Sequence, residues 1–292
     1  MEPLIDEAFL RRLANLKFIV KGRRKGKLAG THPSPRAGTS VEFADYRSYS
    51  PGDDFRYIDW NLLGRLDRLL VKTFVHESDR PIYLLLDFSA SMRLGNPPKA
   101  LYAARFGAAI AYIGLRELDR VGLYPFSDQL LPSVAPRHGM RQMTHILHVL
   151  QGISATGTTS LDRAVEGFLA ASRESGLVFL VSDFLSRTGY QEGISRLLHR
   201  GDDVVVVQIV DPGELHPQLE GSLEIHDVEG GRAVDLVVGR RTLIQYERRL
   251  EGYLQELTRF LAGHRVPYFL VPTDLPLEDL IHERLRVGGV LQ

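Results

Sequence analysis

The sequence predicts an α/β fold, with a doubly wound and mostly parallel sheet that follows an N-terminal extension rich in β and irregular structure. The first observation is that strand-like and helix-like segments alternate from residue 81 onward, which is typical of parallel sheets with crossover helices. The second is that the runs at residues 82–88 and 204–210 are continuously apolar, as expected of strands covered on both faces. These observations also predict a Rossmann-type strand topology.

Each strand of this sheet is expected from a short apolar run. The runs lie at residues 82–88, 120–126, 129–135, 177–184, 204–210 and 266–272. The third contains Pro132, and because proline cannot donate to a strand ladder we place it at the edge of the sheet. Residues 221–238 alternate in polarity around Glu229-Gly230-Gly231, which predicts a β-hairpin insertion.

Longer amphipathic segments separate these runs and predict the helices. They lie at residues 99–118, 140–150, 161–172, 191–198, 242–262 and 277–285. Apolar residues with helical spacing also predict a helix at residues 4–16. Since the strand–helix alternation begins near residue 80, we expect an N-terminal extension at residues 1–78 and an α/β domain at residues 79–292.

Composition excludes several classes of function. The chain has 36 Lys and Arg against 36 Asp and Glu, so its net charge favours neither nucleic acid nor an anionic membrane. It has no cysteine, which excludes thiolate zinc sites and cysteine nucleophiles and fits a reducing compartment. No apolar stretch approaches the roughly 20 residues that span a bilayer, and the N-terminus lacks the pattern of a secretory signal. We therefore expect a cytoplasmic protein without a membrane span.

Oxygen-bearing side chains follow two of the expected strands. Asp87 ends the strand at residues 82–88 and is followed by Ser89 and Ser91, Thr159 lies at the start of a helix, and Asp183 ends the strand at residues 177–184. Ligands of doubly wound sheets bind beyond the carboxyl ends of the strands. If the two strands are neighbours, these five residues meet there. Five oxygen donors suit Mg²⁺ or Mn²⁺ rather than zinc.

The charge of this predicted site indicates its use. Two carboxylates and three neutral hydroxyls screen a divalent cation incompletely, so that it retains affinity for an anionic ligand such as the Glu or Asp of a partner protein. The alternative is a metal-dependent phosphoester hydrolase. The sequence identifies no catalytic base and no nucleophile elbow for such an enzyme, so we expect a protein that is not an enzyme and has no catalytic residue.

The five residues resemble the metal-ion-dependent adhesion site of von Willebrand factor A domains. The resemblance implies that Ser89, Ser91 and Thr159 contact the cation, and that Asp87 and Asp183 act directly or through water. Whether Thr158 or Thr159 is the ligand stays open by one residue.

A second resemblance lies upstream of the α/β domain. A long spaced pattern resembles the signature of a bacterial family known only as domain of unknown function 58. It comprises Glu42, Phe43, Asp45, Arg47, Tyr49, Pro51, Gly52, Asp53, Asp54, Arg56, Ile58, Asp59 and Trp60. The resemblance implies a von Willebrand factor A-like domain and an adaptor or assembly factor that works with a MoxR-type AAA+ ATPase. Many members carry N-terminal membrane-spanning helices. This sequence shows no such apolar segment, so we expect a soluble version of the family.

Two charged segments allow more than one interpretation. In residues 42–60, acidic side chains alternate with Arg47 and Arg56 among aromatic residues. This pattern indicates a structural ion-pair network, or alternatively a face that binds a partner. Residues 17–27 form a basic cluster, but no recognised nucleic-acid module accompanies it, so we expect a solvated loop or a patch for an acidic partner.

Overall fold

The structure is a computed structural model, and it describes residues 4–13, 15–19, 41–48, 60, 70–76, 80–186, 189–231 and 233–292. The chain forms two compact units. The larger unit contains Met1–Lys21 together with Arg80–Gln292, and the smaller unit contains Gly22–Asp79. The N-terminal helix α1 (Glu7–Leu13) therefore belongs to the larger unit.

The smaller unit contains an antiparallel pair of strands, β1 (Val41–Ser48) and β2 (Leu70–His76). The register of this pair shifts between Phe43 and Asp45, which marks a bulge or irregularity in β1.

The larger unit is an α/β fold built on a mixed sheet, which in the described residues has six strands. Five strands are parallel: β3 (Ile82–Asp87), β4 (Val121–Phe126), β6 (Leu177–Ser182), β7 (Asp203–Val210) and β10 (Tyr268–Pro272). The edge strand β5 (Val134–Arg137) runs antiparallel to β4. The strand order is β10-β7-β6-β3-β4-β5, so the predicted mostly parallel α/β sheet is confirmed.

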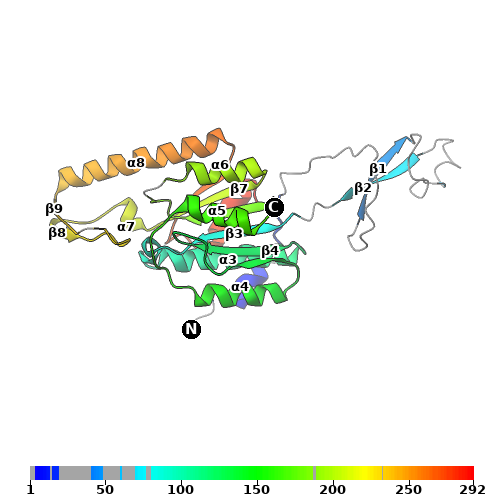
Figure 1. Cartoon of the computed structure of the whole chain (residues 1–292), viewed down its shortest axis with the longest axis horizontal. Helices are drawn as coiled ribbons and strands as arrows, with labels where there is room; N and C mark the ends of the chain where they lie inside the picture. The colour runs from blue at the N-terminus through cyan, green and yellow to red at the C-terminus, as the bar shows by residue number, and fades with distance from the viewer. Residues whose placement is uncertain are drawn as a thin grey trace. The chain divides into compact units, whose positions relative to one another are not determined.

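Helices cover both faces of the sheet (Figure 1). One face carries α1, α3 (Lys99–Arg116), α4 (Arg141–Gly152) and a C-terminal helical segment. The other carries α5 (Leu161–Ala171), α6 (Gln191–Arg200) and the end of α8 (Arg240–Gly263). The C-terminal segment comprises α9 (Leu277–Asp279), a π-helical turn (Leu280–Arg284) and α10 (Leu285–Val287).

The alternation of side chains along β3 explains why this strand is apolar throughout. Ile82, Leu84 and Leu86 pack against the helices of one face. Tyr83 and Leu85 pack against those of the other. Successive side chains of a strand point to opposite faces, so a strand between two helical layers needs apolar residues at every position.

Close contact between α3 and β3 fixes the spacing of these layers. A Cβ atom at Gly107 of α3 would lie 2.6 Å from Cδ1 of Leu86. Glycine at this position allows the helix to approach the strand more closely than any other residue would. The end of β3 is therefore held in a fixed place relative to α3.

The edge of the sheet differs from the sequence prediction. The strand expected at residues 129–135 lies instead at Val134–Arg137. Leu130 forms an isolated bridge with Phe126, and Leu131 donates its backbone N–H to the carbonyl of Pro125. The chain thus turns back tightly along the end of β4 before it can pair as a regular strand.

A short helix and a hairpin follow β7. They are α7 (Pro212–Leu215) and the antiparallel strands β8 (Gly221–Ile225) and β9 (Val234–Val238). The hairpin predicted at residues 221–238 is confirmed. It leads directly into α8, whose buried residues are Leu257 and Leu261, near its C-terminal end. The first half of α8 therefore adds little to the core.

Phe179 of β6 provides a test of this packing. Its side chain is fully buried, and its ring lies 5.8 Å from that of Phe18 and 6.0 Å from that of Phe106. We expect Phe179→Ala to lower the free energy of unfolding by about 3–5 kcal/mol, because it leaves a cavity between α3 and the sheet. Urea denaturation followed by far-UV circular dichroism measures this change.

The matched control is Val287→Ala, since the side chain of Val287 is 90% exposed. We expect it to change the free energy of unfolding by less than about 0.5 kcal/mol. Equal midpoints for the two variants would contradict the described core.

Candidate metal centre

The candidate site lies where the strand order reverses at the centre of the sheet. Counted along the chain within this sheet, the strands follow the order 3-2-1-4-5-6 from the β5 edge, and β3 and β6 are the first and fourth. In doubly wound sheets with this order, ligands bind beyond the carboxyl ends of the strands at this point. Asp87 ends β3, and Asp183 directly follows β6. The two predicted carboxylates therefore lie at the carboxyl ends of neighbouring strands.

Asp87 is fully buried and hydrogen-bonded on both carboxylate oxygens. Ser89 donates its backbone N–H to Oδ1 at 2.8 Å, and Ser182 donates its hydroxyl to Oδ2 at 2.6 Å. Burial and, after it, the charge of Asp183 raise the pKa of Asp87 to about 7. The protein alone therefore compensates the negative charge of Asp87 only in part.

Backbone hydrogen bonds join two loops of the site. Thr156 donates its N–H to the carbonyl of Phe88 at 2.8 Å, and Ala90 donates its N–H to the carbonyl of Gly157 at 2.9 Å. These contacts hold the loop after β3 against the loop that leads into α5. The loop after β3 then forms a short 3-10 helix (Ala90–Arg93), and Oγ of Ser89, the residue before this helix, lies 3.1 Å from Oγ of Ser91.

Thr159 is buried, whereas the neighbouring Thr158 is exposed. The hydroxyl of Thr159 donates to Oε1 of Glu229 at 2.8 Å, and its backbone N–H lies 3.3 Å from Oε2 of the same residue. Ser186, in the loop after β6, donates its hydroxyl to the carbonyl of Thr159 at 3.2 Å. Three loops therefore converge around the ends of β3 and β6.

A buried lysine lies beside the second aspartate. Lys99, the first residue of α3, places Nζ 2.8 Å from Oδ2 of Asp183 and 2.5 Å from Oε1 of Glu214. The side chains of Lys99 and Asp183 are both 0% exposed. Burial alone would lower the pKa of Lys99, but the two carboxylates outweigh it and raise that pKa above its ordinary value. The ammonium therefore stays charged.

The five predicted donors fit a divalent cation by their chemistry. All are oxygen atoms, which Mg²⁺ and Mn²⁺ prefer. Two buried carboxylates also lie close enough for Asp183 to raise the pKa of Asp87, and a cation between them would relieve this repulsion. The described part of the chain holds no group of three or more His, Cys, Asp and Glu side chains placed for a metal ion. A cation site here therefore depends on the serine and threonine hydroxyls.

Sequence reasoning missed four residues of the site. They are Lys99, Ser182, Glu214 and Glu229. One signal was present for Lys99, because a lysine in the first turn of a helix opposes the helix dipole and so indicates a nearby carboxylate. Glu214 and Glu229 reach the site through contacts between segments more than 60 residues apart in the chain, and no local pattern reports such contacts.

Of the charged segment at residues 42–60, the structure describes residues 42–48 and 60. Glu42, Asp45 and Arg47 are backbone positions of β1. The side chain of Trp60 is 60% exposed. The predictions for four residues of this segment lie outside the described residues: Asp53, Asp54, Arg56 and Asp59. Of the basic cluster at residues 17–27, Lys17 forms an ion pair with Glu117 at 3.1 Å, and residues 20–27 also lie outside the described part.

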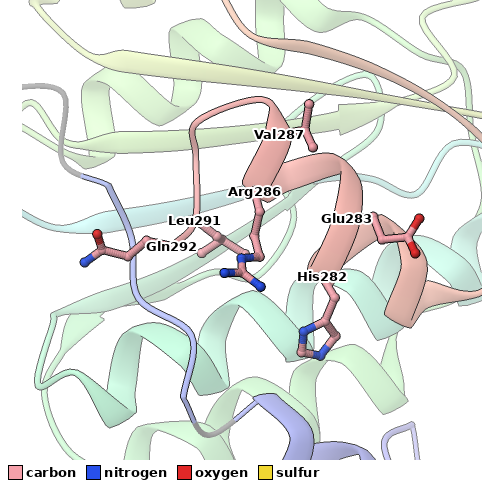
Figure 2. Close-up of a pocket in the computed structure, with 6 residues that line it drawn as sticks. All are labelled: His282, Glu283, Arg286, Val287, Leu291 and Gln292. Carbon is pink, nitrogen blue, oxygen red and sulfur yellow. The ribbon is translucent and has the colours of Figure 1, made fainter.

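A pocket of about 700 Å³ lies elsewhere on the same unit. Figure 2 shows its lining side chains, which come from the C-terminal helical segment and the last two residues: His282, Glu283, Arg286, Val287, Leu291 and Gln292. Leu291 forms a bridge with Phe18, and a Cβ atom at Gly114 would contact both Phe18 and Ile82, the first residue of β3. The pocket thus lies toward the amino ends of the strands, away from Asp87.

Solved structures with a similar arrangement include two proteins of Bacteroides. The conserved hypothetical protein BatB from Bacteroides thetaiotaomicron is 15% identical, with 72% of this chain and 98% of that chain covered and a TM-score of 0.43. An aerotolerance-related membrane protein from Bacteroides fragilis is 13% identical, with 71% and 99% covered and a TM-score of 0.43.

The cytoplasmic localisation expected from the sequence is corrected by these comparisons, since a similar structure is named as a membrane protein. The expectation rested on the lack of an apolar span, and such a lack does not determine the compartment of a protein. Within the described residues, the structure contains no helix that is both long and apolar enough to cross a membrane.

Relatives are also found among curated sequences. An uncharacterized protein from Mycobacterium tuberculosis is 23% identical over 267 residues, which cover 90% of this chain and 84% of the relative. Residues 45–251 match a protein family of unknown function, which has no catalytic description. Because this match covers more than half of the sequence, the chain belongs to the family described as protein of unknown function DUF58.

Proposed function

We propose that the chain is a metal-dependent protein-interaction module. Ser89, Ser91 and Thr159 would hold Mg²⁺ or Mn²⁺, and Asp87 and Asp183 would bind it directly or through water. The cation would then bind a carboxylate of a partner protein. The observation that carries this proposal is the convergence of three loops, which gathers these oxygen donors beyond the ends of β3 and β6.

The strand order supports a von Willebrand factor A-like topology for this unit. Its order is that of doubly wound sheets, with an antiparallel edge strand. The loop that bears Ser89 and Ser91 follows the first strand of the sheet, as the resemblance to a metal-ion-dependent adhesion site requires.

The charge around Asp183 supports the capture of an anion. Lys99 already compensates part of the charge of Asp183, so less negative charge remains for a divalent cation. Three of the five donors are neutral hydroxyls. A cation in this setting keeps a strong attraction for a further carboxylate, which suits binding of an acidic side chain.

We also propose that the partner is a MoxR-type AAA+ ATPase or its client, and that the chain acts as an adaptor or assembly factor. This part of the proposal depends on the family, to which the chain belongs by the match over residues 45–251.

Asp87→Ala tests the site itself. We expect this variant to weaken Mn²⁺ binding by more than about 100-fold, beyond the 10–100-fold effect of residues that only support metal ligands. The fold should survive, because the substitution removes a buried carboxylate whose pKa is already raised. Mn²⁺ titration followed by electron paramagnetic resonance measures the affinity, and circular dichroism monitors the fold.

Asp235→Ala is the control for this titration, because Asp235 lies on the exposed strand β9. It should bind Mn²⁺ like the wild-type chain. Equal affinities of the wild-type and Asp87→Ala proteins would refute the assignment of the site.

Lys99→Met tests the electrostatic role of the buried lysine. Without a divalent cation, we expect it to lower the free energy of unfolding by about 3–5 kcal/mol, because Asp183 remains buried without its partner. Added Mg²⁺ should restore part of the loss, since a cation that binds the folded state stabilises it. Urea denaturation with and without Mg²⁺ provides both values.

Lys17→Met is the matched control, since Lys17 pairs with Glu117 while 56% of its side chain is exposed. We expect it to change stability by less than about 1 kcal/mol and to leave the effect of Mg²⁺ unchanged. If Mg²⁺ stabilises the two variants to the same extent, the prediction that the cation replaces the charge of Lys99 is wrong.

Affinity capture from a bacterial lysate tests the partner. The wild-type and Asp87→Ala chains are used as bait, each with Mg²⁺ and with EDTA, and retained proteins are identified by mass spectrometry. We expect a MoxR-type AAA+ ATPase to be retained by the wild-type chain with Mg²⁺ alone. Identical captures in all four conditions would mean that the metal centre is not the binding face.

A further inference from the structure

The carboxylate of Glu229 lies on Thr159, one of the proposed cation ligands. Oε1 accepts the hydroxyl proton of Thr159 at 2.8 Å, and Oε2 lies 3.3 Å from the backbone N–H of the same residue. Both oxygens of one carboxylate are thus directed at one residue. The two residues are 70 positions apart in the chain, so the contact joins the β8–β9 hairpin to the metal centre.

The turn of the hairpin holds Glu229 in this position. Oδ1 of Asp227 accepts the backbone N–H of Glu229 at 2.9 Å, and the carbonyl of Asp227 accepts that of Gly230 at 3.2 Å. Gly230 has a φ of +93°, which glycine adopts without strain. The backbone of the turn is therefore arranged before any ligand arrives, and Glu229 is the residue it directs to Thr159.

Much of the rest of the hairpin has little contact with the sheet. Val234 is 58% exposed and Val237 is 71% exposed, although both are apolar. Figure 1 shows β8 and β9 beside α7 and the start of α8. Because the packing of its strands is weak, the position of the hairpin depends on polar contacts such as the one between Glu229 and Thr159.

We propose that Glu229 is an in-chain ligand of the metal centre, which occupies the position that the acidic side chain of a partner would take. This inference rests on the proposed function, because it assigns an occupant to the same site. Glu229 has the chemistry expected of the partner's group, a carboxylate, and contacts a residue proposed to bind the cation. In the free protein, the metal centre would then be occupied by a carboxylate of its own hairpin.

The consequence is competition between the hairpin and the partner. A partner carboxylate that binds the cation must displace Glu229, and the turn at residues 226–231 then leaves Thr159. In the absence of a partner, the cation strengthens the attachment of the hairpin, because it attracts the carboxylate of Glu229 in addition to the two contacts from Thr159.

The test uses the full chain with Mn²⁺ alone as the probe. It compares the wild-type chain with Glu229→Gln, which removes the charge and keeps the size of the side chain. Glu224→Gln is the matched control, because Glu224 lies on the same hairpin with 59% of its side chain exposed and pairs with His226. Three quantities are measured: the Mn²⁺ dissociation constant, the water-proton relaxation of bound Mn²⁺, and amide hydrogen exchange in residues 227–231.

We expect Glu229→Gln to raise the Mn²⁺ dissociation constant about tenfold, which is less than the effect of Asp87→Ala, because water can take the place of a ligand that a partner is able to displace. Relaxation per bound Mn²⁺ should increase, because water replaces the lost carboxylate. Mn²⁺ should slow amide exchange in residues 227–231 of the wild-type chain and of Glu224→Gln but not of Glu229→Gln.

Two failures can be told apart. If the wild-type chain binds Mn²⁺ but Glu229→Gln matches it in all three measurements, Glu229 is not a ligand and the proposed function stands. If the wild-type chain shows no more Mn²⁺ binding than Asp87→Ala, the proposed function fails and the role of Glu229 fails with it.

Discussion

Two buried carboxylates at the ends of neighbouring strands impose the main constraint on this fold. Asp87 and Asp183 are both fully removed from solvent, and transfer of a carboxylate from water into a protein interior is costly unless its charge is compensated. Much of the local structure provides this compensation. Ser182 donates to Asp87, and Lys99 pairs with Asp183. The start of α3 and the loops after β3 and β6 are placed by these contacts.

The strands and helices could be predicted from sequence because each has a strong local pattern. A strand buried on both faces, such as β3, is apolar up to its last residue, and α3 follows it as a long segment rich in alanine. The edge strand β5 was placed too early, because its start depends on the turn in which Leu131 bonds to Pro125. That turn is a contact between segments rather than a pattern of residue types.

The candidate site was predictable only in part. Asp87 and Asp183 could be predicted from the sequence because they lie at the ends of strands, and the carboxyl ends of parallel strands lie at one edge of the sheet. Lys99, Glu214 and Glu229 were missed because they come from a helix start, a short helix and a hairpin turn that are close in space alone. The compartment could not be derived either, since a missing apolar span says nothing about where a chain resides.

The length of α8 separates the hairpin from the residues that anchor this helix in the core. A helix of 24 residues spans about 36 Å at 1.5 Å per residue. Its first residues follow β9 directly, and its anchoring residues Leu257 and Leu261 lie near the far end. The first half of the helix is mostly exposed, so a shift of the turn around Glu229 would alter few apolar contacts and would leave the packing of the sheet unchanged.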